Sequence, residues 1–257
     1  MTEKKIASEL LCNYFVFARA LSPEQQEQIF RLRYEVYCRE FGYEREEDCP
    51  GQRETDPYDA AADHCLLRHR DSGIAAGCVR LVLPDDPGHS GVMQLPLEEA
   101  CAGSLNHHRF HPSLLPRNEI CEVSRLAVLP TFRRRHGEEK TPFGDPEGLV
   151  FSSRERRAFP LLAVGLFLAA TAMVGLAGRH HVFAIMEPRL ARLLERSGLH
   201  FTQVGKVVEY HGRRAPFYID QRIAEESMID PLKELYREIR GDLRQHKKGV
   251  TPLSGTA

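Results

Sequence analysis

The chain has 257 residues, a length that fits one elaborated α/β domain better than two. Its 35 lysines and arginines almost balance its 36 aspartates and glutamates, so net charge does not favour a nucleic-acid partner. The seven cysteines form no CxxC pair and no His/Cys zinc pattern, so we expect free thiols and no metal site. Because the N-terminus does not resemble a secretory signal, we expect a reducing, cytoplasmic location.

The start of the chain carries a strand signal followed by a helix signal. A strand is predicted over residues 14–17. Ser22, Pro23 and Gln25 form the pattern of a capping box that begins a helix. Gly42 is expected to end this helix. Its aromatic residues recur at helical spacing: Phe30, Tyr34, Tyr37 and Phe41.

An acidic, irregular loop is expected over residues 45–63. Two apolar runs, 64–70 and 74–84, flank Asp71-Ser72-Gly73 and therefore predict an antiparallel hairpin. Further along, we expect a loop-rich segment (84–116), a strand (122–130), a polar insertion (133–157), an apolar helix (159–178), a strand (181–188), a short helix (188–198), two strands (201–210 and 213–220) and a charged helix (225–248). No internal repeat or low-complexity linker marks a second domain.

The apolar run needs a membrane test. Residues 158–178 contain no charged side chain, and a run of roughly 18 such residues can span a bilayer. Against spanning, the run is rich in Ala and Gly, has Pro160 at its start, and precedes a segment typical of a buried strand. We interpret it as a buried helix, with peripheral membrane contact as an open alternative. An apolar ligand beside the helix would account for its composition.

Four short motifs stand out in the sequence. The first joins LRYEVY (32–37) to FGY (41–43), and the others are DPYD (56–59), GCVRL (77–81) and EVSRLAV (122–128). In this order and spacing they resemble the signature of acyl-homoserine-lactone (autoinducer) synthases and of N-acyl amino acid synthases. With the apolar helix and the MEP…RLLERSG segment included, the sequence most resembles acyltransferases associated with PEP-CTERM/exosortase loci.

This resemblance implies the GNAT (acyl-CoA N-acyltransferase) fold. That fold is an α/β (α+β) architecture in which a central mixed, mostly antiparallel sheet is flanked by helices. The predicted order of elements agrees with it, although topology alone is weak ground for function. We expect a single GNAT-like domain over residues 1–257, with a core at about 14–220 and a charged helical extension at 221–257.

Charged residues in the motifs predict a site for a small polar acceptor. Arg33 and Tyr37 are four apart and share one helix face, and Arg80 lies in an apolar strand, where we expect it to be buried and paired. Carboxylates beside arginines can bind a zwitterion; the alternative is a salt-bridge network that only closes the loop over the sheet. The predicted substrate-binding residues are Arg33, Tyr37, Tyr43, Asp56, Asp59 and Arg80.

For catalysis we expect direct attack of an amine on an acyl thioester. An α-amine has a reference pKa of about 7.7–8.0, so a base must take its proton. The resemblance implies Glu122 as this base, with Arg125 beside it; the alternative for Glu122 is an ion pair with an arginine. The two face the same side only if the strand bulges, as GNAT central strands do. No Cys/His/Asn arrangement supports an acyl-enzyme.

The donor is expected to bind along the central strand and the apolar helix. Backbone N–H groups near Leu126, Ala127 and Val128 would stabilise the oxyanion. Arg133, Arg134 and Arg135 replace the glycines of a coenzyme A pyrophosphate loop. This favours acyl carrier protein, an acidic partner, over acyl-CoA as the thioester donor, unless these arginines are only a solvated charge run.

The helix from residue 159 to 178, with Leu166 and Phe167, could wall an acyl tunnel, although core packing is the commoner role of such residues. No permanently bound cofactor is expected.

The sequence therefore predicts an N-acyltransferase that moves a long-chain fatty acyl group from a carrier-protein or CoA thioester to the amine of a small polar acceptor, such as an amino acid. One alternative is an acyl-homoserine-lactone synthase that uses S-adenosylmethionine, although Tyr43 stands where those enzymes usually have Trp. A second is a non-catalytic lipid- or membrane-binding module. A nucleic-acid binder ranks last, because the arginine run has no interleaved aromatics.

Overall fold

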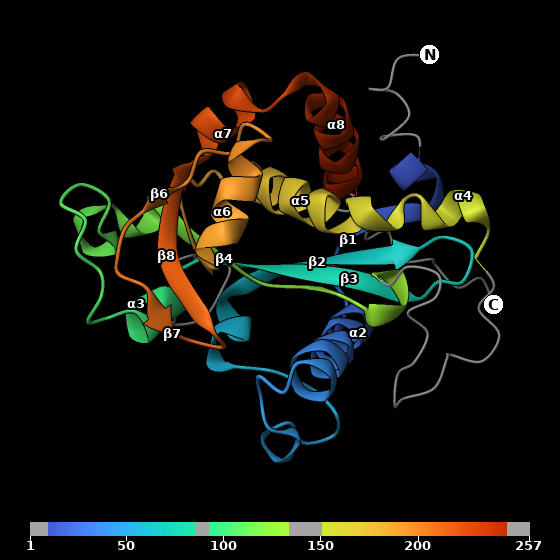
Figure 1. Cartoon of the computed structure of the whole chain (residues 1–257). Coiled ribbons are helices and arrows are strands. Elements are labelled where there is room, and N and C mark those ends of the chain that lie inside the picture. The colour runs from blue at the N-terminus through green and yellow to red at the C-terminus, as the bar shows by residue number, and fades with distance from the viewer. Residues whose placement is uncertain (1–9, 86–92, 134–150, 246–257) are drawn as a thin grey trace, which may run out of the picture.

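A computed structural model describes residues 10–85, 93–133 and 151–245. Its centre is an eight-stranded sheet in the order β1-β2-β3-β4-β5-β8-β6, and β7 pairs with β8 outside this path (Figure 1). The strands are β1 (Phe15–Arg19), β2 (Ala62–His69), β3 (Ala75–Val82), β4 (Ile120–Val128), β5 (His181–Met186), β6 (Thr202–Gln203), β7 (Val208–Glu209) and β8 (Arg213–Asp220). Only β4 and β5 pair in parallel, which confirms the predicted mixed, mostly antiparallel sheet.

Helices cover both faces of this sheet. The α-helices are α2 (Pro23–Tyr34), α3 (Pro96–Ala100), α4 (Ser153–Arg156), α5 (Leu162–Leu176), α6 (Pro188–Glu195), α7 (Gln221–Ser227) and α8 (Asp230–Gln245). In Figure 1, α5 and α8 lie above the sheet and α2 lies below it. Helix α5 contacts β2, β3 and β4 on one side and α7 and α8 on the other, whereas α2 contacts β2, β3 and β4 from the opposite face.

The start of α2 follows its sequence signal. The Ser22 hydroxyl accepts a hydrogen bond from the Gln25 amide, and the Gln25 side chain accepts one from the Ser22 amide, which confirms the capping box. The helix continues as a π-helix, η1 (Glu35–Glu40), and ends at Gly42, whose φ is +60°. A left-handed residue at this place favours glycine, as the sequence predicted.

The hairpin β2–β3 is also confirmed, with Gly73 at φ +70° in its turn. Next to it, β4 carries the expected bulge. Cys78 pairs with Ala127, but two residues further along β3, Arg80 pairs with Ser124, so β4 has one extra residue. Arg125 lies in this bulge with φ +51°, a left-handed conformation that is uncommon for a residue with a side chain.

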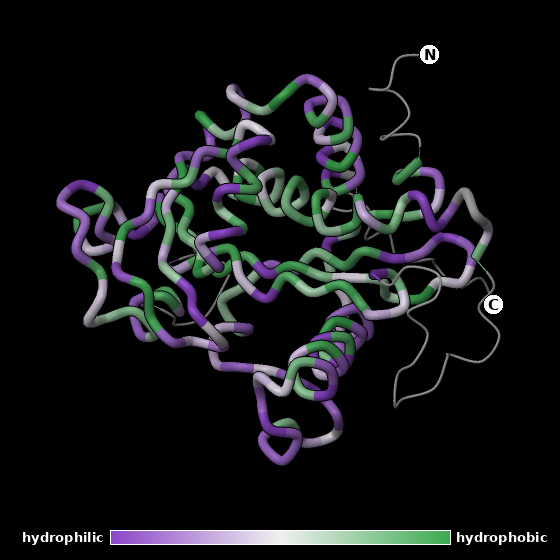
Figure 2. The backbone as a smooth tube through the Cα atoms, in the orientation of Figure 1, coloured by the Kyte–Doolittle hydropathy of each residue, from purple (hydrophilic) through white to green (hydrophobic). Residues whose placement is uncertain are grey.

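The apolar run forms a short 3₁₀ turn, η7 (Phe159–Leu161), followed by α5. By length and composition this stretch could cross a membrane, and 56% of it is buried within the fold. Its small residues allow close approach: a Cβ on Gly165 would lie 2.6 Å from Cζ of Phe17. On the far side, α8 buries Leu235 and Leu243 in the same core. Apolar residues accordingly follow α5 and the central strands in Figure 2.

Two sequence predictions need correction. The continuous strand expected over 201–210 is broken into β6 and β7. The Pro216 carbonyl accepts a hydrogen bond from the Val204 amide. Proline has no N–H, so Pro216 cannot donate a hydrogen bond in return and the strand pairing stops. Beyond this point the Lys206 amide donates to the Ser104 carbonyl instead. The helix expected over 225–248 begins at Asp230, after the separate helix α7. The polar insertion lies mostly outside the described residues, and so do Arg134 and Arg135.

Candidate active site

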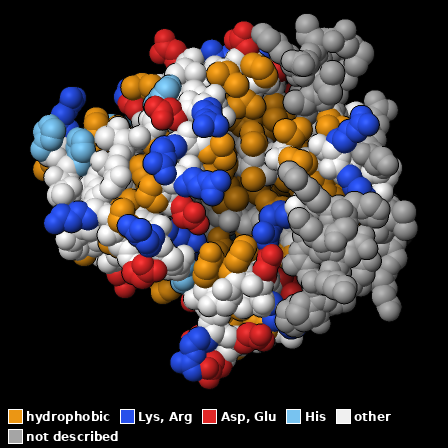
Figure 3. All heavy atoms as spheres, viewed as in Figure 1, with side chains coloured by type: hydrophobic (Ala, Val, Ile, Leu, Met, Phe, Trp, Pro, Cys, Tyr) orange, Lys and Arg blue, Asp and Glu red, His pale blue; other side chains and the backbone are white. Residues whose placement is uncertain are grey.

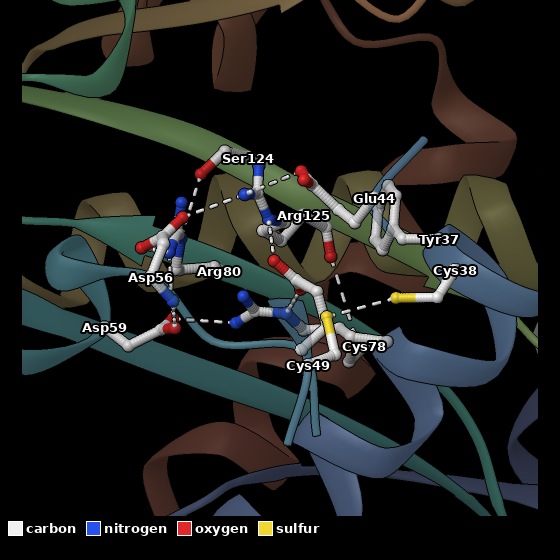
Figure 4. Close-up of polar contacts among 12 residues, drawn as sticks. Tyr37, Cys38, Glu44, Cys49, Asp56, Asp59, Cys78, Arg80, Ser124 and Arg125 are labelled. Carbon is white, nitrogen blue, oxygen red and sulfur yellow. Dashed lines mark hydrogen bonds and ion pairs between the residues drawn. The ribbon is translucent and has the colours of Figure 1, made fainter. Parts of the chain in front are cut away.

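Six buried or half-buried charged side chains gather on the α2 face of the sheet (Figure 4). We call these residues the charged cluster: Arg33 from α2, Arg80 from β3, Arg125 from β4, and Glu54, Asp56 and Asp59 from the loop before β2. Five of the six were predicted to share a site. Four segments that are distant in sequence therefore meet at the bulge of β4.

Arg33 is fully buried and joins α2 to the loop. Its Nε donates to Glu54, and its Nη1 donates to Asp59 over 2.7 Å. Arg80 has 1% of its surface exposed; it donates to Asp56, to Asp59 over 2.8 Å and to the Ser124 hydroxyl over 3.1 Å. Both guanidinium groups are therefore held by carboxylates of one loop, as their burial requires.

Arg125 completes the cluster from the bulge. Its Nε donates to Glu54 over 3.1 Å, and its Nη2 lies 2.9 Å from a carboxylate oxygen of Asp56. The guanidinium also lies over the ring of Tyr37, 5.6 Å from the ring centre. The Tyr37 hydroxyl in turn donates to the Leu126 carbonyl over 3.1 Å, so the helix is bonded directly to the bulged part of β4.

The DPYD motif folds into a short 3₁₀ helix, η3 (Pro57–Ala61), with its own capping box. The Asp56 carboxylate accepts from the Tyr58 amide over 2.9 Å, and the Asp59 carboxylate accepts from the Asp56 amide over 2.8 Å. Burial opposes ionisation of Asp59, but the charges of Arg33 and Arg80 outweigh it and lower the pKa of Asp59. Both carboxylates are thus already paired within the chain.

This pairing favours the salt-bridge network, the alternative interpretation of Asp56 and Asp59. Two arginines can still donate hydrogen bonds, because the Nη2 atoms of Arg33 and Arg80 are buried and have no hydrogen-bond partner in the described part of the chain. Glu54, the sixth member, was not predicted from the sequence. Its side chain is buried between exposed neighbours in an irregular loop, where no periodic pattern signals burial.

Glu122 lies on the same side of the sheet as the charged cluster. Its carboxylate, on a side chain only 1% exposed, accepts a hydrogen bond from the Leu97 amide over 2.8 Å. Burial raises the pKa of Glu122 to about 8, against the lowering effects of that amide and of the charges on Arg80 and Arg125. Such a carboxyl changes protonation state near neutral pH, unlike a solvated glutamate.

The sheet opens immediately after Glu122. In the described residues, the β4–β5 register covers only Ile120–Glu122 against His181–Phe183, so β4 and β5 separate beyond this point. An apolar pocket of about 460 Å³, counted with the solvent at its opening, lies on the α5 face beside this gap. It is lined by Val123, Phe167, Ala170, Thr171, Val174, Val182, Ala184, Met186, Leu199, Phe201, Ile219, Gln221 and Ala224. Apart from Thr171 and Gln221, these lining residues are apolar.

The structure places only some of the predicted donor-binding residues at the pocket. Phe167 lines the pocket. Leu166 is fully buried and does not line it. Leu166 packs against β3 instead, where its Cδ1 lies 2.9 Å from the position that a Cβ on Gly77 would take. Arg133 is tied to its own chain, since it donates to the Val128 carbonyl over 2.7 Å and to Glu40. Figure 3 shows hydrophobic side chains in a central hollow of one face, with lysines and arginines around them.

Tyr43 lies in an aromatic group at the edge of the cluster. Its ring stacks on Phe41, with 5.1 Å between ring centres, and lies 5.0 Å from the ring of His211. Arg214 covers it at 5.3 Å. His211, at the tip of the β7–β8 hairpin, was not predicted; it approaches Glu44 at 3.5 Å, and burial, followed by the charges of Arg214 and Arg125, lowers its pKa.

No arrangement of three or more His, Cys, Asp or Glu side chains that could hold a metal ion occurs within residues 10–85, 93–133 and 151–245. The groups present at the site are the buried carboxyl, the arginines, the backbone groups along β4 beyond Glu122 and the apolar pocket. These groups suit proton transfer and oxyanion stabilisation next to an apolar ligand.

Comparison with known proteins supports this description of the fold. The model of the acetyltransferase (GNAT) domain matches residues 32–141, a span that contains all four motifs. No curated protein sequence matches the chain.

Several solved structures share the architecture at low sequence identity. TofI, in a ternary complex with an inhibitor and MTA, is similar with a TM-score of 0.55 and 18% identity, over 86% of this chain and 99% of that one. MesI, a CoA-dependent acyl-homoserine lactone synthase, gives 0.54 and 18%, over 88% and 95% of the two chains. FeeM, an N-acyl amino acid synthase from uncultured soil microbes, gives 0.51 and 13%, over 86% and 97%. Identity this low establishes a common fold and nothing finer. The chain therefore has the GNAT fold.

Proposed function

We propose that this protein is an N-acyltransferase that transfers a fatty acyl group from a thioester to the amine of a small acceptor bearing a carboxylate. One observation carries the proposal: a buried carboxyl and an apolar pocket lie at the same point of β4, where the sheet opens. FeeM, a structural neighbour, is an N-acyl amino acid synthase, and MesI is a CoA-dependent acyl-homoserine lactone synthase. Both descriptions fit an acyl thioester donor and a small amine acceptor.

In this mechanism Glu122 acts as the general base. Its pKa of about 8 is close to the reference value of an α-amine, about 7.7–8.0, so proton transfer between the two is nearly balanced. The amine then attacks the thioester carbon, the C–S bond breaks, and the thiol leaves with a proton. Backbone N–H groups along the part of β4 that does not pair with β5 would stabilise the oxyanion.

The arginines support an acceptor with a carboxylate. The unpartnered Nη2 groups of Arg33 and Arg80 are buried donors, and a carboxylate would satisfy them. Arg125 would position the acceptor together with Tyr37 and Tyr43. In this scheme Asp56 and Asp59 hold the arginines in place.

For the donor we propose an acyl carrier protein, with acyl-CoA as the alternative. β4 leads into a 3₁₀ turn, η6 (Pro130–Phe132). This turn contains no glycine, whereas the pyrophosphate of CoA would suit a glycine-rich loop followed by a helix N-terminus. Exposed arginines on α6, Arg189 and Arg192, add positive charge on the helix that precedes the pocket-lining Leu199 in the chain. All seven cysteines are free thiols, which supports a reducing, cytoplasmic location. The narrower assignment to the exosortase-associated acyltransferases is part of the same proposal.

A lactone-forming activity is the second candidate. The aromatic group around Tyr43 could stack on an adenine ring, and BjaI, with a TM-score of 0.53, has been solved with SAM and isopentyl-CoA. Such an enzyme would form a lactone only from S-adenosylmethionine. A non-catalytic lipid-binding role would leave both substrates unchanged.

The experiment is a substrate panel read by mass spectrometry. The purified chain is incubated with long-chain acyl carrier protein or acyl-CoA, and with amino acids, their carboxamides, or S-adenosylmethionine. We expect N-acyl amino acids, formed at least about tenfold faster than N-acyl carboxamides because the carboxamide lacks the charge that the arginines bind. Absence of any N-acyl product or lactone with every donor would reject the enzyme assignment.

A further inference from the structure

Two cysteine sulfurs touch one another at the edge of the molecule. The Sγ atoms of Cys38 and Cys49 are 3.3 Å apart, and both side chains are buried (Figure 4). With Tyr34 they form a small apolar cluster separate from the main core. No metal, ligand or catalytic step described above uses this pair.

Backbone hydrogen bonds fix both cysteines in place. Cys38 lies in the π-helix η1, where its carbonyl accepts from the Gly42 amide over 3.2 Å. Cys49 ends a 3₁₀ turn, η2 (Glu46–Asp48), and its carbonyl accepts from the Gln52 amide over 3.2 Å. The Tyr34 hydroxyl donates to Glu46 over 2.6 Å, which ties the turn to the helix. Because the backbone holds both positions, the sulfurs stay in contact.

We propose that Cys38 and Cys49 are a redox-sensitive dithiol that a hydroperoxide converts into a reversible disulfide. A disulfide bond is about 2.05 Å long, so the sulfurs need to approach by about 1.3 Å, which side-chain rotation can supply. In the first step one thiolate attacks the peroxide, the O–O bond breaks, and a sulfenic acid forms with loss of water or alcohol. The second thiol then attacks that sulfur and releases water. The two sulfurs lose two electrons, and the peroxide is reduced.

The position of the pair gives the disulfide a structural consequence. Cys38 follows Tyr37, which is bonded to the bulge of β4, and Cys49 precedes Glu54, which binds Arg33 and Arg125. The new bond would join the two segments that hold the charged cluster. This inference concerns the thiols and stands without the proposed acyl transfer.

The remaining cysteines provide internal comparisons. Cys65 and Cys121 are fully buried in the main core. Cys101 is also buried, at the end of helix α3. Burial raises the pKa of the Cys38 thiol to about 12 and also raises that of Cys49, so reaction should be slow at neutral pH and faster in alkaline buffer.

The test treats the folded, full-length protein with hydrogen peroxide at rising pH and then alkylates the remaining thiols. We expect a product lighter by two hydrogen atoms, a Cys38–Cys49 cross-linked peptide after proteolysis, and complete reversal by dithiothreitol. The thermal midpoint should rise on oxidation and return on reduction, because the cross-link restricts the unfolded chain.

Cys38→Ser and Cys49→Ser should each abolish the cross-link, while Cys101→Ser should retain it. Cys38→Ala provides a second variant if the serine variant does not fold, as judged by circular dichroism. Peroxide adducts without a cross-link in the folded protein would overturn the proposal, as would a cross-link between other cysteines.

Discussion

Glu122 and Val123 are neighbours on β4, yet their side chains leave the sheet on opposite faces. Glu122 interacts with Arg80 and Arg125 of the charged cluster, and Val123 lines the apolar pocket. Alternation along a strand produces this arrangement, and β4 separates from β5 directly after Glu122. An acyl chain in the pocket would thus present its carbonyl beside the base.

The first prediction concerns the pH dependence of catalysis. A carboxyl with its pKa at about 8 is mostly protonated at lower pH and cannot accept a proton, so kcat/KM should rise with pH and level off above about 8. The acceptor amine also titrates in this range. Measuring the pH profile with acceptors of different amine pKa separates the two effects. If Glu122 is responsible, the pH at which kcat/KM levels off is the same for every acceptor. A levelling pH that follows the pKa of each acceptor contradicts the assignment.

The same carboxyl should make stability depend on pH. The folded-state pKa of Glu122 is raised above the unfolded value, so the folded protein binds more protons than the unfolded chain between about pH 4.5 and 8. Stability due to this group is therefore lost as pH rises through that window. Glu122→Gln should raise the thermal midpoint relative to wild type at pH 9 and much less at pH 5. An equal difference at both pH values would contradict this linkage.

Breaking the charged cluster should destabilise the fold strongly. Arg33→Ala would remove one of the two arginine partners of Glu54 and of Asp59, and removal of one member of a buried pair typically costs about 3–5 kcal/mol. Arg31→Ala, on the exposed side of the same helix, removes only a pair with Glu27 and should cost less than about 0.5 kcal/mol. Urea unfolding measures both, and similar losses for the two variants would argue against a structural cluster.

Filling the pocket should change the preferred acyl chain. Ala170 on α5 lines the pocket, and Ala170→Leu should raise KM for long-chain donors by roughly tenfold while leaving short-chain donors little affected. Ala163→Leu makes the same change at an exposed position of α5 and serves as the control. An unchanged chain-length profile for a folded Ala170→Leu protein would remove the pocket from donor binding.

Gly77 tests the packing around the bulge. A Cβ there would lie 2.8 Å from the Ala127 carbonyl oxygen and 2.9 Å from Leu166, and the backbone oxygen cannot easily move away. Gly77→Ala should therefore lower the free energy of unfolding by about 1–3 kcal/mol. Gly103→Ala, where a Cβ meets nothing within 4 Å, should change it little. A well-tolerated Gly77→Ala substitution would show that β3 and β4 are less closely packed.

Local chemistry explains which parts of the fold were predictable. The capping box at Ser22 and the turn at Gly73 depend on residues within a few positions, so the sequence alone predicted them. The break after β6 depends on which edge of β8 Pro216 faces, a tertiary fact that periodicity does not contain. The bulge at Arg125 was expected only through family resemblance.

The site residues, like the elements of the fold, were predictable only where the sequence itself carries a signal. Arg80 stood out because a charge in an apolar strand needs a partner. Arg33 stood out through its motif and its spacing to Tyr37, and Glu122 through the family resemblance. Glu54 did not, since neighbouring residues in its loop are also charged and only the fold decides which one is buried. The predicted acyl-binding roles of Leu166 and Phe167 differ in the structure because side chains of adjacent helical residues point in different directions, Leu166 into the core and Phe167 into the pocket.

In the proposed reaction, the buried carboxyl of Glu122 on β4 removes the proton from the acceptor amine. The direct measurement is the single-turnover rate of N-acyl product formation by wild type, Glu122→Gln and Glu119→Gln, with Glu119 as a partly exposed carboxylate just before β4. We predict a loss of at least about 10²-fold for Glu122→Gln and little change for Glu119→Gln. Equal rates for wild type and a folded Glu122→Gln protein would show that Glu122 is not the base.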